Sequence, residues 1–401
     1  MNGSTRRDRA TLAVVVWAVL VSQVLLYPGV EDLIAALGAP SGIEAGMWFL
    51  VAEFAAFVIC AGLWGALSDA VGRRVPLIVA GALGGALGYV AIAAAPSFGL
   101  SFGAVLSLRA LCGALTIGAF SLSITMLMDL AGGHGRNMGA AGIAIGLGAA
   151  IGSVVGGRLT TVDPLAPLYG AAALLLLVAL LAGTVEDRAP GERRASVGAV
   201  LSRLSDRPAL GVPYAFGFID RLTAGFFALV GVYYFRDAFG LDAAAAGVVL
   251  SLFFFPFAVL QYPLGVLSDR IGRFLPVVAG SMLYGVAIVA VGVAPGLELA
   301  AGLMVLVGVF GALVAPATMA LVTDLVAPEE RGAAMGGFNV FGSLGFLTGF
   351  LIGGFVADAH GYLPAFVVVG LMEVSIAVLA LRAVRRIAPD PEGPEKPAPD
   401  A

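Results

Sequence analysis

The sequence predicts an all-α polytopic membrane protein with 12 transmembrane helices in two pseudo-symmetric six-helix bundles. Of its 401 residues, 60% are hydrophobic and 12% are charged, which leaves too little polar surface to cover a water-soluble protein. Twelve apolar runs each approach the roughly 20 residues that a helix needs to cross a hydrocarbon core of about 30 Å. A charged pattern in the first half also recurs 200 residues later, which indicates an internal repeat.

The apolar runs are too long and too uniformly apolar to be the alternating strands of a membrane barrel. We therefore expect each run to be one membrane-spanning helix. In chain order, the predicted spans are 11–33, 44–66, 76–95, 101–129, 137–158, 167–184, 209–235, 243–266, 275–294, 297–324, 332–356 and 363–384.

The polar stretch between the sixth and seventh runs divides the chain into domains. Residues 1–184 form the predicted N-terminal six-helix bundle, and residues 209–384 form the C-terminal one. The linker, 185–208, has apolar residues at helical spacing, which predicts a short amphipathic helix on the inner membrane surface. The tail, 385–401, is rich in proline and acid and is predicted to be disordered in the cytoplasm.

Basic residues set the predicted orientation in the bilayer. With a cytoplasmic N-terminus, Arg158 and Arg236 are the basic residues on the outer side, and most of the others lie on the inner side. The positive-inside rule then places both termini in the cytoplasm of a cell membrane. Arg6, Arg7 and Arg9 precede the first apolar run. Because eleven more runs follow, these arginines are interpreted as part of a signal anchor and not of a cleaved signal peptide.

A short acidic and basic motif occurs once in each half. "GALSDAVGRR" at 65–74 recurs as "GVLSDRIGRF" at 265–274, and an aspartate closes both the fourth and the tenth run. A purely structural interpretation is that each copy forms a tight cytoplasmic turn between two helices. The residues concerned are Gly65, Asp69, Gly72, Arg73, Arg74, Asp129, Gly265, Asp269, Gly272, Arg273 and Asp324.

This motif resembles the loop between helices 2 and 3 of the major facilitator superfamily of secondary transporters, which reads G-x-L-x-D-x-x-G-R-[RK]. The resemblance implies two six-helix halves that rock about a central site. It also implies that these residues form a gating network that latches the halves together when the protein is open outward. Within that network, Asp129 is expected to offer a carboxylate to Arg73.

A second repeat consists of glycines in the fifth and eleventh runs. Their spacing permits close helix packing, and packing alone would explain it. It also resembles the helix 5 signature of drug and proton antiporters, G-x8-G-x3-G-P-x2-G-G, although Ser153 and Phe350 stand where that signature has proline. The glycines are Gly139, Gly148, Gly152, Gly156 and Gly157, paired with Gly336, Gly345, Gly349, Gly353 and Gly354.

Charged residues inside predicted spans are the next candidates, and the pair Asp220 and Arg221 has no counterpart in the first half. Charges inside a span are expensive and usually face a cavity or a partner. Asp220 is the first candidate for carrying a coupling proton, with Arg221 beside it, and Glu53 is its rival. Arg109 fits part of a family pattern in helix 4 and would modulate the proton-carrying acid or contact substrate. Static ion pairs are the alternative, and for Glu373 a structural or lipid-edge role is expected.

Polar and aromatic residues in the runs suggest what the central cavity holds. The candidates for lining it are Gln23, Tyr27, Phe226, Phe227 and Asn339. If the aromatic rings face the cavity, the substrate is amphipathic or lipophilic, because a sugar site needs more hydrogen-bonding side chains.

Other function classes find no support in the sequence. Both histidines fall in predicted loops, Cys60 and Cys112 lie in apolar runs, and there is no phosphate-binding loop, so we expect no enzyme, cofactor or metal site. We expect a small-molecule substrate, protons as the coupling ion, a lipid bilayer, no nucleic acid and a monomer. The predicted function is proton-coupled efflux by alternating access; a proton symporter or facilitator for a small polar metabolite is the alternative.

Overall fold

The computed structural model describes residues 3–130, 134–187, 207–327 and 330–388, and within these ranges it is built of helices without strands. The predicted amphipathic helix of the linker falls in 188–206, and most of the predicted tail falls in 389–401, so both lie outside the described residues.

The first half contains six long helices and one short one. The short helix, α2 (Val30–Ala36), follows α1. The long helices are α1 (Gly3–Val24), α3 (Ile43–Val71), α4 (Val75–Ala94), α5 (Phe102–Met128), α6 (His134–Val162) and α7 (Ala166–Ala182).

The second half repeats this plan. Its first span is α9 (Gly211–Phe226) continued by the π-helical turn η3 (Phe227–Gly231) and α10 (Val232–Phe239). The others are α11 (Ala243–Ile271), α12 (Phe274–Gly292), α13 (Leu297–Asp324), α14 (Arg331–His360) and α15 (Tyr362–Ile387).

Ten of these helical segments are long and apolar enough to cross a membrane. The shorter apolar helix α7 and the N-terminal helix α1 account for the other two predicted spans, so the all-α polytopic architecture is confirmed. The predicted end of the first span is wrong: α1 ends at Val24, and α2 begins a separate helix at Val30. Pro28 and Gly29 lie in the interruption, and a Pro-Gly pair breaks a helix because proline lacks the amide hydrogen.

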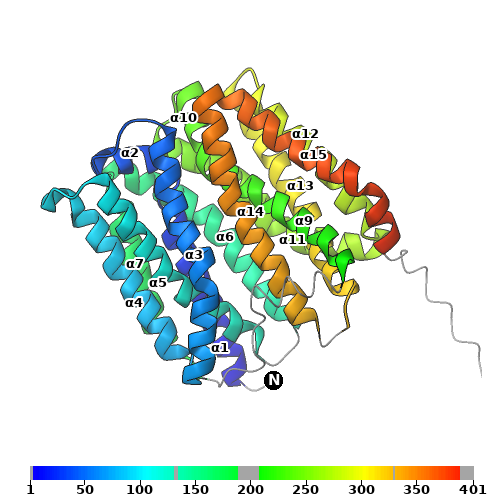
Figure 1. Ribbon diagram of the computed structural model, residues 1–401, viewed down its shortest axis with the longest axis horizontal. Helices are drawn as coiled ribbons and strands as arrows, with labels where there is room; N and C mark the ends of the chain where they lie inside the picture. Colours follow the sequence, from blue (N-terminus) through cyan, green and yellow to red (C-terminus); the bar gives the residue numbers. More distant parts are fainter. Residues whose placement is uncertain (1–2, 131–133, 188–206, 328–329, 389–401) are drawn as a thin grey trace, which may run out of the picture.

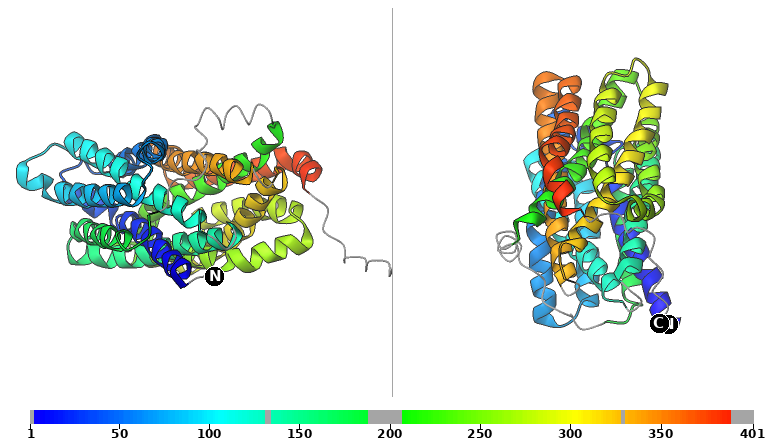
Figure 2. Two further views of the ribbon diagram at one scale, coloured as in Figure 1. Left: turned by 90° about the horizontal axis from the view of Figure 1, so that it is seen from below. Right: turned by 90° about the vertical axis from the view of Figure 1, so that its right-hand side faces the viewer.

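The two halves lie side by side (Figures 1 and 2). We call the end where α1 begins and where Gly72 and Gly272 form turns the terminal face. The opposite end, with α2 and α10, is the distal face (Figure 1). Gly72 caps α3 in the left-handed region with a φ of 69°, and Gly272 has a φ of 84°, a conformation that glycine adopts without steric cost.

Glycines let helix backbones touch inside each half. A Cβ atom added to Gly156 of α6 would lie 2.2 Å from the Leu25 carbonyl oxygen, and one at Gly345 of α14 would lie 2.0 Å from the Phe218 oxygen. The repeat-related glycines make equivalent contacts: Gly148 and Gly152 face α1, and Gly349 and Gly353 face α9. Gly139 lies in α6, but its surroundings fall outside the described residues, and Gly336 faces open space.

The last glycine of each set contacts the other half. A Cβ at Gly157 would lie 2.2 Å from the Ala243 carbonyl oxygen of α11, and one at Gly354 would lie 2.6 Å from the Met47 sulfur of α3. The α6–α11 contact continues toward the terminal face, where a Cβ at Gly146 would lie 2.5 Å from the Ala258 Cβ.

The α3–α14 contact is confined to the distal part of the molecule. Phe54 of α3 stacks on Phe346 of α14 with ring centroids 4.7 Å apart, and Trp48 lies edge-on to Phe355 at 6.0 Å. Nearer the terminal face, no atom of the described residues lies within 4 Å of a Cβ added to Gly62 of α3 or Gly336 of α14. The halves are therefore closed against each other at the distal face.

Replacing Gly157 with alanine should lower the thermal stability of the protein. The added methyl group would collide with backbone rather than with a flexible side chain, and overpacking of this kind costs about 1–3 kcal/mol. The measurement is the melting temperature in detergent. Gly336→Ala, which meets open space, is the matched control, and equal melting temperatures for the two variants would contradict the packing argument.

Candidate functional site

The turn between α3 and α4 at the terminal face is tied to two other helices of its own half. Arg74 Nη1 lies 2.5 Å from Asp129 Oδ2 at the end of α5. Asp187, just after α7, accepts the backbone N–H of Arg74 at 3.0 Å and forms a 3.5 Å ion pair with Arg73. The prediction that Arg73 reaches Asp129 is wrong, because Arg74 is the arginine that points toward α5 while Arg73 points toward Asp187. Asp69 is exposed in the last turn of α3, and Gly65 is buried one turn earlier.

The corresponding turn of the second half uses a single arginine. Arg273 contacts Asp269 at 2.5 Å, Asp324 at 3.2 Å and the Ser268 hydroxyl at 3.1 Å. Phe274 occupies the position of Arg74, so Arg273 alone joins α11 to the end of α13. Gly265 packs against Pro316 of α13 at 3.4 Å from an added Cβ. Both networks thus connect helices within one half in this conformation.

An ion pair joins the two halves at the distal face. Arg236 of α10 donates to Asp32 of α2 through both terminal nitrogens, at 2.8 and 3.1 Å, and lies 3.6 Å from Glu31. Partial burial raises the pKa of the Glu31 carboxyl, and Arg236 acts in the opposite direction. The sequence analysis assigned no role to these residues. The available signal was the scarcity of basic residues on that side, where Arg236 was one of two.

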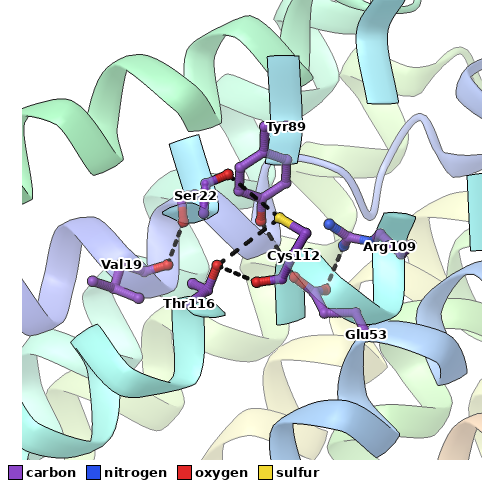
Figure 3. A network of polar contacts seen from close by, with 8 residues as sticks. Val19, Ser22, Glu53, Tyr89, Arg109, Cys112 and Thr116 are labelled. Atoms are coloured by element: carbon purple, nitrogen blue, oxygen red, sulfur yellow. Dashed lines mark hydrogen bonds and ion pairs between the residues drawn. The ribbon is translucent and has the colours of Figure 1, made fainter. Parts of the chain in front are cut away.

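Two predicted charged residues of the first half pair with each other inside the helical bundle (Figure 3). Arg109 of α5 donates to Glu53 of α3, and the side chains point toward one another. The Tyr89 hydroxyl donates to the other Glu53 oxygen at 3.3 Å, and the Arg109 guanidinium lies 4.7 Å from the centroid of the Phe49 ring. Both charged residues are almost completely buried, with exposed fractions of 1% and 0%.

Close packing fixes this ion pair in place. A Cβ at Gly113, one turn beyond Arg109, would lie 2.5 Å from the Glu53 carbonyl oxygen, so α3 and α5 approach backbone to backbone beside the pair. Arg109 therefore has Glu53 as its partner and not Asp220. The charges compensate each other, which is how charge is tolerated inside a membrane.

Asp220 and Arg221 of α9 lie on different faces of that helix. Asp220 is buried inside the second half, and its Oδ1 atom has no hydrogen-bond partner among the described residues. Arg221 is partly exposed and lies against α14, with its Cγ 3.2 Å from a Cβ placed on Gly342. Glu373 is also buried, with 1% exposed, so the lipid-edge role expected for it is wrong.

The candidates for lining a cavity fall into three groups. Phe226 and Phe227 have no exposed surface and pack against Phe366 at centroid distances of 4.9 and 5.9 Å, so they do not line a cavity in this conformation. Gln23 and Tyr27 are buried near the junction of the halves, where Tyr27 lies edge-on to Phe350 at 6.3 Å. Asn339 is exposed on α14.

These features define a class of protein: a helical membrane transporter with two halves, and not an enzyme. The family model of the Major Facilitator Superfamily matches residues 12–235 and 214–400, nearly the whole chain. The chain belongs to this superfamily, as its repeated motif indicated.

Several curated relatives are transporters or resistance proteins. The chain is 28% identical to the tetracycline resistance protein, class C, of Escherichia coli over 342 residues, which cover 82% of this chain and 84% of that one. It is 28% identical over 157 residues to multidrug resistance protein 1 of Bacillus subtilis (strain 168), covering 39% and 40%. A match to an uncharacterized MFS-type transporter of Methanocaldococcus jannaschii, 28% identical over 163 residues, covers 41% of this chain and 42% of that one.

A solved structure shares the fold at low sequence identity. It is a bacterial homologue of the human lysosomal transporter Spinster in an inward-facing, unoccupied conformation, with a TM-score of 0.77 at 15% identity. The similarity covers 98% of this chain and 100% of that one.

Arg236→Ala should open the distal face, because the bidentate pair with Asp32 is lost. Spin labels are attached at Val162 and Leu299, exposed positions at the distal ends of α6 and α13, in a protein whose Cys60 is replaced by alanine so that it takes no label. In this background, Arg236→Ala should lengthen the distance between the two labels. Arg158→Ala removes an exposed arginine from the same face and is the control. Exchanging the charges in Arg236→Asp/Asp32→Arg should restore the short distance between the labels. An unchanged distance in Arg236→Ala would show that the Arg236–Asp32 ion pair does not hold the distal face closed.

Glu53→Gln should destabilise the protein strongly, because it leaves Arg109 as an uncompensated buried charge. Breaking a buried pair in this way costs about 3–5 kcal/mol. Melting temperatures in detergent of Glu53→Gln, Arg109→Met and the double variant provide the test. The double variant should lose less than the sum of the two single losses, and strict additivity would show that the pair is not coupled. Glu44→Gln, an exposed acid at the start of α3, is the control.

Proposed function

We propose that this protein is a proton-coupled exporter of lipophilic or amphipathic small molecules, working by alternating access in the cell membrane. The observation that carries the proposal is the buried carboxylate of Asp220, the tenth residue of α9, one oxygen of which has no hydrogen-bond partner among the described residues. A transporter that moves protons needs a titratable group in such a place, and static packing does not. The names of the relatives from Escherichia coli and Bacillus subtilis support export as the direction.

The proposed orientation places the terminal face in the cytoplasm, since basic residues are concentrated at that face. The conformation described here is then inward-facing. The pair between Arg236 and Asp32 acts as the outer gate, and the networks of Arg74 and Arg273 stay within their halves until the inner side closes. Exposed ion pairs contribute only about 0–1 kcal/mol each, so such gates can open and close readily.

Aromatic rings and one cation support an amphipathic substrate. Phe54 and Phe346 are partly exposed where the halves meet, and Phe120 lies 5.9 Å from Phe57 in the same region. Arg221 supplies a partly exposed positive charge in the second half, with no ion-pair partner among the described residues. Rings of this kind bind apolar surface, while one charged group selects orientation.

Proton movement in proteoliposomes tests the proposal. With a pH gradient across the membrane, addition of tetracycline or another amphipathic compound should trigger proton flux in the wild-type protein. Asp220→Asn should abolish this flux while leaving the protein folded, because asparagine cannot release a proton. Asp358→Asn, an exposed aspartate near the distal end of α14, should behave like wild type.

Other outcomes would change the assignment. Flux that survives in Asp220→Asn would transfer the proton-carrying role to Glu53. Labelled substrate that equilibrates without proton movement would refute coupling and favour a facilitator. Uptake in the direction of the proton gradient would favour a symporter for a small metabolite.

A further inference from the structure

Two buried carboxyl groups of the second half lie on α9 and α15, helices that pack on each other, and the sequence analysis did not pair them. Asp220 lies on α9 and Glu373 on α15, and both act electrostatically on the Tyr284 hydroxyl of α12. Glu373 is enclosed because α12 and α15 touch beside it: a Cβ on Gly285 would lie 2.4 Å from the Gly370 carbonyl oxygen and 3.0 Å from the Glu373 Cβ.

The groups around these acids are neutral. Glu373 is near the hydroxyls of Thr223 and Ser281, and Tyr284 has no exposed surface. The one cation that acts on Asp220 among the described residues is Arg221, its chain neighbour, which points to another face of α9. The helices α13 and α14 also pack on α9, but within the described ranges they bring no charged group that acts on either acid. In contrast, the buried acid of the first half, Glu53, has Arg109 as a direct partner.

The hydrogen bonds of the Thr223 hydroxyl indicate that Glu373 holds a proton. Thr223 Oγ1 lies 3.3 Å from the Ile219 carbonyl oxygen and 3.2 Å from Glu373 Oε1. A hydroxyl has one hydrogen, so it can donate to only one of these oxygens at a time. If Glu373 carries a proton, it can donate to Thr223 while Thr223 donates to Ile219, and both contacts are hydrogen bonds.

Two ionised carboxyl groups in such a place would be unfavourable, since Arg221 points to another face of α9 and no cation among the described residues acts on Glu373. We propose that α9, α12 and α15 enclose a proton-binding site in which Asp220 and Glu373 share an exchangeable proton, with the Thr223 hydroxyl bonded to Glu373 and the buried Ser281 and Tyr284 hydroxyls, which have no hydrogen-bond partner among the described residues, beside it. Asp220, 5% exposed, is the entry group, and the more deeply buried Glu373 is the inner one. No covalent bond other than O–H is made or broken, and the proton that leaves one carboxyl is taken up by the other or by water.

The π-helical turn gives α9 a means of rearranging near the site. The turn at Phe227–Gly231 begins four residues after Thr223, and such turns are local departures from helical hydrogen bonding that recur at functional sites. A shift of α9 against α15 there would separate Asp220 from Glu373 and so change how tightly the shared proton is held.

Infrared spectroscopy of the purified full-length protein tests the site without transport. At neutral pH, where exposed carboxyl groups are ionised, the carbonyl stretch of a protonated carboxyl group should be present in the wild-type protein, and it should disappear as pH rises further. Asp220→Asn and Glu373→Gln should each change the pH at which the band of the remaining acid is half lost. The double variant should lack the band. Asp358→Asn is the control that keeps it. Persistence of the band in the double variant, or midpoints unaffected by either single change, would overturn the proposal.

Only the use of this proton in transport rests on the proposed function, and the two can fail separately. If the band titrates as described but no compound triggers proton flux, the site stands and the exporter proposal fails. If substrate-driven flux persists in Glu373→Gln and in the double variant, coupling stands and the site is not its carrier. Melting temperatures identify variants that do not fold, and Glu373→Asp, which keeps the carboxyl, should then restore both the band and the flux.

Discussion

The close approach of helix backbones at glycines is the constraint on which this structure depends. Within a bilayer, lipid tails are as apolar as leucine, so helices associate through packing and not through exclusion from water. Gly156 and Gly345 show how far this goes, because a single added carbon would collide with a carbonyl oxygen of α1's end or of α9. Three glycines of each set face the first helix of their own half, which makes each half one solid unit.

The fourth contact position in each set has a different role. Gly157 meets α11 and Gly354 meets α3, so the same repeat that consolidates a half also provides the surface on which the other half rests. The contact at Gly157 is with backbone, whereas the one at Gly354 is with the flexible side chain of Met47. The α6–α11 contact is therefore suited to act as a pivot between the halves. The α3–α14 contact can separate at a lower cost in free energy.

The ion pairs at the two faces and the buried ion pair have different roles, which match this arrangement. The pairs at the two faces, such as those of Arg74 and Arg236, have at least one partly exposed member and are cheap to break. The Glu53–Arg109 pair is fully buried, so separating its members would leave charge in a medium that cannot solvate it. We infer that movement occurs at the faces and that the buried pair holds α3 and α5 together throughout.

Sequence alone predicted the architecture because the responsible signals are local or repetitive. Twelve apolar runs, two copies of an acidic and basic turn, and the glycine spacing all follow from the order of residues. The end of α1 was predicted wrongly, at residue 33, although Pro28 and Gly29 interrupt the first apolar run. The choice between Arg73 and Arg74 could not be predicted from the sequence, because both lie between α3 and α4, where no helical periodicity sets the direction of a side chain. Only the fold shows which one meets α5.

The buried partners were harder to predict because each depends on which face a helix turns inward. All sides of these helices are apolar, so hydrophobic periodicity gives no inward direction. A structural or lipid-edge role was expected for Glu373, and the contact of Gly285 with Gly370, which encloses it, contradicts the lipid-edge alternative. Phe226 and Phe227 were expected in the cavity, yet they fill the core against Phe366. Pairing Arg109 with Glu53 likewise required the backbone approach at Gly113.

The two halves share a scaffold but differ in how they hold buried charge, and this difference gives the molecule a direction. In the first half an acid is neutralised by a fixed guanidinium, which neither gains nor loses a proton at physiological pH. In the second half Glu373 is bonded to a hydroxyl group, and Arg221, the cation that acts on Asp220 among the described residues, lies on another face of α9, so we infer that the charge of these acids changes by uptake or release of protons. In the mechanism proposed here, a symmetric scaffold that can rock in either sense is linked to the proton gradient by the exchangeable charge of its second half.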